Sequence, residues 1–226
     1  KPRHEYFCLD LRRYYVTERQ MVQTIQSRDV TLRELRTNFG LQLTHDPQFF
    51  PEWQGNLPEI TELQQQQLDQ VKAGYFNLLN YPPMLEGVVR MAILDPLLFI
   101  GGFYLAPFHV KAEKSVKIAT EDEETIITGT LDVWVLKDTV WVMVIESKQV
   151  EFSIEAGLAQ ILSYMLANPD REQPSFGMIT TGGSFIFLKV ISGESPQYGL
   201  SRLFSLLNPG NDLYTVLRIL KQLARF

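Results

Sequence analysis

Two carboxylates and a lysine stand in two neighbouring segments that are rich in β-forming residues. Asp132 lies in the segment 129–136, and Glu146 and Lys148 end the segment 140–148, which is otherwise almost entirely apolar. Side chains two positions apart on a strand project from the same face, so we expect Glu146 and Lys148 to point the same way at the strand end. A hairpin between the two segments would bring Asp132 alongside. Carboxylate oxygens suit Mg²⁺ or Mn²⁺, so this pattern favours phosphodiester hydrolysis.

The bulk composition is that of an ordinary globular chain that can bury a full core. It has 226 residues, of which 45% are hydrophobic and 21% charged. The single cysteine, Cys8, excludes an intramolecular disulfide and a cysteine metal cluster. It fits a reducing compartment, and we expect a cytoplasmic protein without a membrane partner. The apolar stretch 91–108 is interrupted by Asp95, Pro96 and two glycines, which argues against a transmembrane helix.

The net charge of −5 argues against a nucleic-acid binder that relies on overall charge. A bound divalent metal and a local basic rim could offset it. Arg90, Lys111, Lys114, Lys117 and Lys148 are candidates for that rim, and a solvated strand edge is the simpler interpretation of each lysine.

The first eighty residues are predicted to be helical. The S/T-x-x-E/Q capping pattern recurs at Thr17, Thr31 and Thr61. After Thr61, apolar residues recur at the period of an amphipathic helix up to Leu79. Residues 44–58 are rich in Pro, Asp, Gly and aromatic residues and are interpreted as an ordered connector. We expect residues 1–81 to form a helical extension, packed as one unit with a second domain over 82–226.

The second part alternates between the two types of element. A helix is expected from near Met84, followed by strands over 111–118, 126–136 and 139–145. A helix over 154–167 and strands over 176–181 and 184–190 follow. Asn211 is expected to cap a terminal helix. The order indicates an α/β (α+β) fold with a mixed sheet flanked by helices.

Several motifs in the sequence resemble those of a known family. Asp132 followed by Glu146-Ser-Lys148 resembles the PD-(D/E)XK nuclease superfamily, and Gln160-Ile-Leu-Ser-Tyr164 resembles the Q-x-x-x-Y element of its RecB-type members. The segment 85–97 is similar to the opening of the nuclease domain in type I restriction enzyme R subunits. The resemblance covers about 84–190. The sequence lacks a phosphate-binding loop, so the likeness concerns the nuclease domain alone. It also departs from the pattern because Leu131 replaces the proline before Asp132.

The resemblance implies a restriction-endonuclease-like core and a Mg²⁺- or Mn²⁺-dependent endonuclease acting on nucleic acid, DNA above all, in a restriction or defence system. Asp132, Glu146 and the Ser147 backbone carbonyl would bind the metal, and Glu86 would join them from its helix. Lys148 would act at the attacking water, in a protonation state that is left open. The remaining roles go to Gln160, which would orient water or phosphate, and to four residues expected to contact nucleic acid: Tyr164, Arg90, Lys111 and Lys114.

Other interpretations of the same residues stay open. Glu86 and Arg90 are spaced for a surface ion pair, and Gln160 and Tyr164 for the polar edge of an amphipathic helix. The whole domain could be a catalytically silent nucleic-acid-binding or assembly module. It could also function as a homodimer or need a partner subunit.

Overall fold

The computed structural model describes residues 23–82, 86–108, 110–111, 114–119, 125–131, 133–136, 140–144, 154–168 and 173–226. The strands are β1 (Gln23–Gln26), β2 (Gln42–Leu43), β3 (Val110–Lys111), β4 (Lys114–Ala119), β5 (Thr125–Leu131), β6 (Val133–Leu136), β7 (Val140–Val144), β8 (Ser175–Thr180), β9 (Ser184–Ile191), β10 (Gln197–Leu200) and β11 (Phe204–Ser205). The α-helices are α1 (Leu32–Phe39), α2 (Glu62–Leu79), α3 (Glu86–Val89), α4 (Asp95–Gly101), α5 (Ile154–Leu166) and α6 (Leu213–Leu223). Shorter helical turns are η1 (Ser27–Asp29), η2 (Pro51–Trp53) and the π-helical η3 (Arg90–Leu94).

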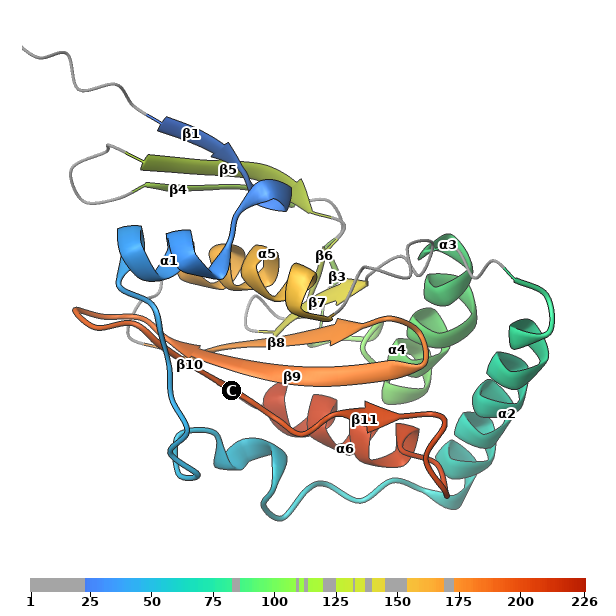
Figure 1. Ribbon diagram of the computed structural model, residues 1–226. Helices are drawn as coiled ribbons and strands as arrows, with labels where there is room; N and C mark the ends of the chain where they lie inside the picture. The colour runs from blue at the N-terminus through green and yellow to red at the C-terminus, as the bar shows by residue number, and fades with distance from the viewer. Residues whose placement is uncertain are drawn as a thin grey trace, which may run out of the picture.

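The strands form two sheets with one helix between them. The large sheet has the order β2-β10-β9-β8-β7-β6-β3, with β11 also paired to β9, and the small sheet has the order β1-β5-β4. Helix α5 lies between the two sheets, and α6 covers the opposite face of the large sheet (Figure 1). Parallel and antiparallel pairs occur in both sheets, as in the β7–β8 and β8–β9 pairs. The expected mixed sheet flanked by helices is confirmed.

Two hydrophobic clusters fill the faces of the large sheet. Side chains alternate along β8, so Phe176 and Met178 face the cluster under α2, α4 and α6, while Ile179 faces the cluster around α5. Strand β8 is buried along its whole length because both its faces are covered. Within the described residues, none of the helices is long and apolar enough to cross a membrane.

The chain changes sheets twice where the sequence predicted continuous strands. The predicted strand 126–136 is divided into β5, which belongs to the small sheet, and β6, which belongs to the large one. The predicted strand 111–118 is likewise divided into β3 and β4. Strand periodicity does not distinguish one sheet from another, because each half alternates in the same way. The two changes of sheet lie close together, since β3 pairs with β6 and β4 with β5.

The prediction of helices throughout the first eighty residues was wrong in two places. Gln23–Gln26 is strand β1, paired in parallel with β5, and Gln42–Leu43 is strand β2, paired in parallel with β10. The capping boxes at Thr31 and Thr61 are confirmed, and they begin α1 and α2. The capping pattern at Thr17 lies outside the described residues. Since β1 belongs to the small sheet and β2 to the large one, residues 23–81 contribute to both sheets.

The predicted helix after residue 84 contains a wider turn in its middle. Helix α3 continues through η3 into α4, and the backbone N–H of Asp95 donates to the carbonyl of Arg90, five residues earlier. Pro96 is the next residue, and it has no N–H to donate. The wider turn carries the helix into α4, whose last residue is followed by Gly102 in the left-handed conformation.

Candidate active site

The residues with the strongest predicted chemistry lie outside the described part of the chain. These are Asp132, Glu146, Ser147 and Lys148. Their described neighbours form the predicted hairpin. Strands β6 and β7 are antiparallel, with Val133 opposite Met143. The residue after Asp132 is therefore paired with the strand whose last residue, Val144, precedes Glu146 by two positions.

Two predicted lysines are in register with the same strands. Lys111 of β3 is the partner of Val135, and Lys114 of β4 is the partner of Leu131. Leu131 immediately precedes Asp132 in the chain. The sheet pairing therefore brings the backbone of both lysines to strands that flank the predicted metal ligand, on either side of the change of sheet.

Strands β7 and β8 are parallel and connected through α5. Val144 pairs with Thr180, so the carboxyl ends of β7 and β8 lie at the same edge of the large sheet. The hydroxyl of Thr180, which is fully buried, accepts a hydrogen bond of 3.0 Å from the N–H of Gly182. This bond fixes the turn from β8 into β9 beside the end of β7.

Helix α3, which begins at Glu86, is packed against this turn. Val89 is fully buried one turn after Glu86, and a Cβ added to Gly182 would come within 2.9 Å of it. Gly182 has a φ of +88°, a conformation that favours glycine. The next glycine, Gly183, lies against the ring of Tyr75 from α2. These contacts bring the backbone of Glu86 to the edge of the sheet at which β7 and β8 end.

Arg90 lies four residues after Glu86, about one helical turn away, and is exposed. The hydroxyl of Tyr104 is 3.3 Å from a carboxylate oxygen of Asp95. Burial first, and then the charge of Asp95, raise the pKa of Tyr104 to about 12, and the charge of Arg90 opposes this shift. Arg90 already interacts within the chain, so a contact with nucleic acid would compete with those interactions.

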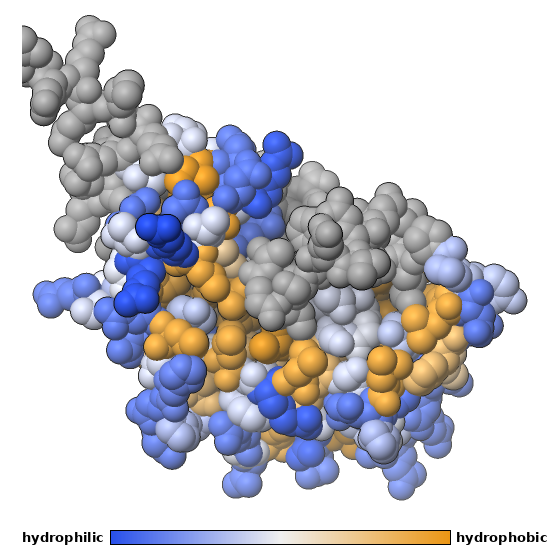
Figure 2. All heavy atoms as spheres, viewed as in Figure 1, coloured by the Kyte–Doolittle hydropathy of each residue, from blue (hydrophilic) through white to orange (hydrophobic). Residues whose placement is uncertain are grey.

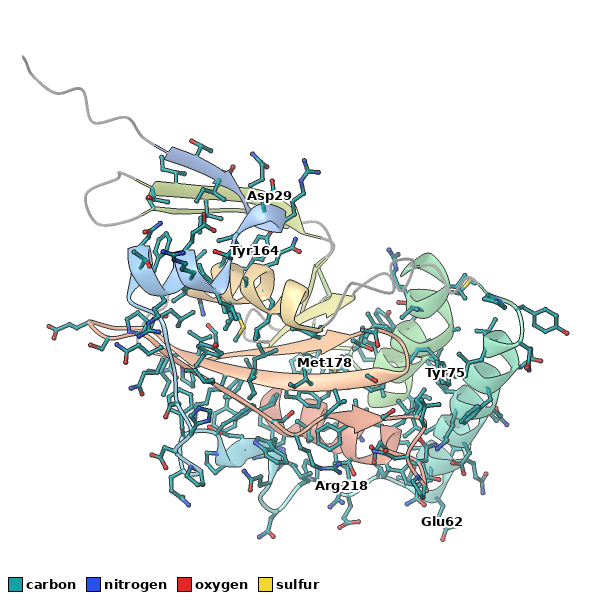
Figure 3. All side chains as sticks on the ribbon, viewed as in Figure 1. Asp29, Glu62, Tyr75, Tyr164, Met178 and Arg218 are labelled. Carbon is teal, nitrogen blue, oxygen red and sulfur yellow. The ribbon has the colours of Figure 1, made fainter. Side chains whose placement is uncertain are left out.

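Helix α5 brings Gln160 and Tyr164 into different environments. Gln160 is half-buried, and its backbone carbonyl accepts a hydrogen bond of 2.7 Å from the hydroxyl of Ser163. Tyr164 is only 1% exposed, and its hydroxyl bonds to that of Ser27 in η1. Figure 3 shows Tyr164 between α5 and the turn that carries Asp29. The burial of Tyr164 favours a structural role, joining α5 to η1, over the predicted contact with a nucleic-acid backbone.

Three structural partners of the site were not found in the sequence. Ser27 bonds to Tyr164. Val89 of α3 packs against Gly182, and Tyr75 of α2 packs against Gly183. A Gly-Gly pair between two predicted strands signals a turn. It does not signal which helix packs on that turn, because that contact joins residues far apart in sequence.

The described residues do not by themselves complete a metal site. They contain no group of three or more His, Cys, Asp or Glu side chains that could hold a metal ion. Of the predicted ligands, only Glu86 belongs to a described element, and its position is known from the backbone of α3. A comparison of the chain with protein-family models and with curated proteins finds no match.

Proposed function

We propose that this chain is a Mg²⁺-dependent nuclease that hydrolyses phosphodiester bonds in nucleic acid, with DNA as the expected substrate, and that its core is restriction-endonuclease-like. The observation that carries the proposal is the register of β6, β7 and β8. The antiparallel β6–β7 hairpin is followed by α5 and by the parallel strand β8. Together with α3, this order supports a common site for Asp132, Glu146 and Lys148 at one edge of the large sheet.

The proposed roles follow from the chemistry of each side chain. Asp132 and Glu146, with the carbonyl of Ser147, would hold Mg²⁺, which when bound polarises a phosphoryl oxygen. Lys148 would hold the attacking water in line or lower the cost of its deprotonation. Glu86 would approach from α3, whose packing on Gly182 supports that position. Gln160 is half-buried on α5 and would orient the water or a phosphate oxygen.

Cleavage of plasmid and single-stranded DNA tests the proposal. The full chain is incubated with each substrate in Mg²⁺ or Mn²⁺, beside the variants Asp132→Asn and Lys148→Ala. We expect a loss of at least about a hundredfold in each variant, because each removes a group that acts on the transition state. Thr139→Ala is a suitable control, since the hydroxyl of Thr139 has no proposed chemical role. Cleavage that is equally fast in wild type and both variants would refute the assignment.

Metal binding separates this function from that of a catalytically silent module. The acidic net charge of the chain is compatible with a silent module, and a complete Asp-Glu-Lys set favours the enzyme. Calorimetric titration with Mn²⁺ should give a binding signal that Asp132→Asn abolishes. DNA binding without any Mn²⁺ signal would instead support the silent module.

A further inference from the structure

The described cationic side chains differ sharply in what they contact. Most of them make hydrogen bonds or ion pairs with other residues of the chain. The carbonyls of Asn208 and Gly210 accept from Lys72, those of Leu57 and Pro58 accept from Arg218, and Lys221 donates to Gln64. Acidic partners lie beside Lys189 and Arg202, and Arg225 donates to Gln222. Arg90 has further interactions of its own.

Arg33 and Arg36 of α1 are the exception among the cationic side chains that the structure describes. Both are exposed, and neither makes a hydrogen bond or an ion pair there. They are three residues apart on a helix, so they lie on the same face with roughly 5–6 Å between their Cβ atoms. Arg28, in the turn before α1, is 79% exposed and only 3.8 Å from Asp29, a weak surface pair. Figure 2 shows strongly hydrophilic side chains over α1.

The helix that carries these arginines is held firmly in place. Thr31 and Glu34 form a complete capping box, and Gly40 ends the helix in the left-handed conformation. Leu35 is fully buried in the cluster around α5. Helix α1 is fixed against α5, the helix that carries Gln160. A ligand bound by Arg33 and Arg36 would therefore lie beside α5 (Figure 1).

We propose that Arg33 and Arg36 form a contact surface for the phosphodiester backbone of a nucleic acid, the substrate of the proposed nuclease. The inference rests on that function for the identity of the ligand. A guanidinium group donates two parallel hydrogen bonds to a phosphate, and the loss of counterions from the nucleic acid adds to binding. A local surface of this kind also explains how a chain with a net charge of −5 can bind a polyanion.

The packing of α1 favours nucleic acid over a lipid surface. A helix that lies in a membrane interface needs an exposed apolar face in addition to basic residues. The apolar residues of α1 offer little surface for this purpose, because Leu35 is buried and Leu32 and Phe39 are partly buried against the same cluster. The exposed face of α1 is therefore polar, and it suits phosphates in water.

The experiment measures DNA binding without cleavage. A short fluorescein-labelled duplex and the matching single strand are titrated with the full chain in EDTA, at several salt concentrations. Each lost phosphate contact changes the slope of log affinity against log salt by roughly 0.7 to 0.9. Each single variant should therefore reduce the slope by about that amount, and the double variant Arg33→Gln/Arg36→Gln by roughly 1.4 to 1.8. The charge-retaining variant Arg33→Lys/Arg36→Lys should keep most of the slope.

Arg225→Gln is the matched control, because it removes the same charge from an exposed site at the other end of the chain. An unchanged slope in the double variant, or an equal reduction in Arg225→Gln, would overturn the proposal. So would binding to phosphatidylserine vesicles that depends on the two arginines while DNA binding does not. If the arginine-dependent binding is found and no DNA is cleaved, the nuclease function fails and the surface stands. If DNA is cleaved and the double variant binds normally, only the surface fails.

Discussion

Apolar clusters fill both faces of the large sheet, and the two faces differ in the polar contacts that supplement this packing. On the face covered by α6, directional polar contacts join distant segments: Lys189 of β9 lies 2.5 Å from Glu52, and Arg218 donates to the carbonyls of Leu57 and Pro58 at 3.0 and 2.9 Å. Figure 3 shows Arg218 on this side. On the other face, α5 is packed between the sheets mainly by apolar side chains, supplemented by the Ser27–Tyr164 bond.

This difference predicts which face is more sensitive to the loss of a polar group. Hydrogen bonds and ion pairs depend on direction, so they fix the segments that they join, whereas apolar packing is non-directional. Helix α5, which carries the candidate residue Gln160, lies on the face that the Ser27–Tyr164 bond supplements. We therefore expect substitutions of polar groups to cost most on the α6 face and less around α5.

Lys189→Met should have the largest effect. The side chains of Lys189 and Glu52 are 9% and 12% exposed, and the ammonium group also lies over the rings of Phe49 and Phe176. Removing the lysine charge leaves a buried carboxylate without its partner, which costs about 3–5 kcal/mol of unfolding free energy. Urea denaturation measures this loss.

The double variant Lys189→Met/Glu52→Leu is the control for that prediction. It removes both charges, so it should recover much of the stability that Lys189→Met loses. A loss below about 1 kcal/mol in Lys189→Met would show that the α6 face does not depend on this pair.

Tyr164→Phe should have an intermediate effect on the α5 face. It removes the hydroxyl bonded to Ser27, whose side chain is buried in the same region, and leaves a buried polar group without this partner. We expect a loss of about 1–2 kcal/mol in urea denaturation. Ser27→Ala/Tyr164→Phe should be more stable than Tyr164→Phe alone. If the single variant is as stable as the wild type, the contact does not join η1 to α5.

The smallest effect is expected from the titration of Asp69. Hydrogen bonds from Asn211 first, and then from Tyr214, lower the pKa of the Asp69 carboxyl below its ordinary value of 3.8. A lowered pKa stabilises the fold above the ordinary value, and this stability is lost as the pH falls through the folded-state pKa. Asp69 is exposed, so solvent screening limits the contribution to less than about 1 kcal/mol.

Urea denaturation from pH 6 down to about pH 2 tests this sign. Asp69→Asn should be less stable than the wild type at pH 6, and the difference should shrink toward pH 2. A difference that grows at low pH would contradict the direction of the shift.

Local signals in the sequence predicted local structure well. The capping boxes at Thr31 and Thr61 are present, and the predicted helices over 154–167 and after Asn211 are close to α5 and α6. Asn211 does accept a hydrogen bond from the N–H of Leu213, although Asp212 occupies the cap position of α6. Each of these features is decided by residues within a few positions of one another.

The errors concern contacts between distant residues. Gln23–Gln26 was predicted to be helical, and it is a strand because β5 provides an edge for it. A contact that the sequence did not reveal joins the hydroxyl of Tyr164 to that of Ser27, 137 residues earlier, and the predicted role of Tyr164 stays a prediction. The chemistry proposed for Asp132, Glu146 and Lys148 stays a prediction, because those residues lie outside the described part of the chain.

The pairing of β1 with β5 has a consequence for biosynthesis. Gln26 and Thr128 are hydrogen-bonded across these strands and are 102 residues apart in the chain. At about 5–20 residues per second, a ribosome needs roughly 5–20 s to make the chain between them. The interval is longer for β2, because its partner β10 is made later than β5. During that interval a nascent chain carries two strands without their partners, and a chaperone that binds extended segments would find them there.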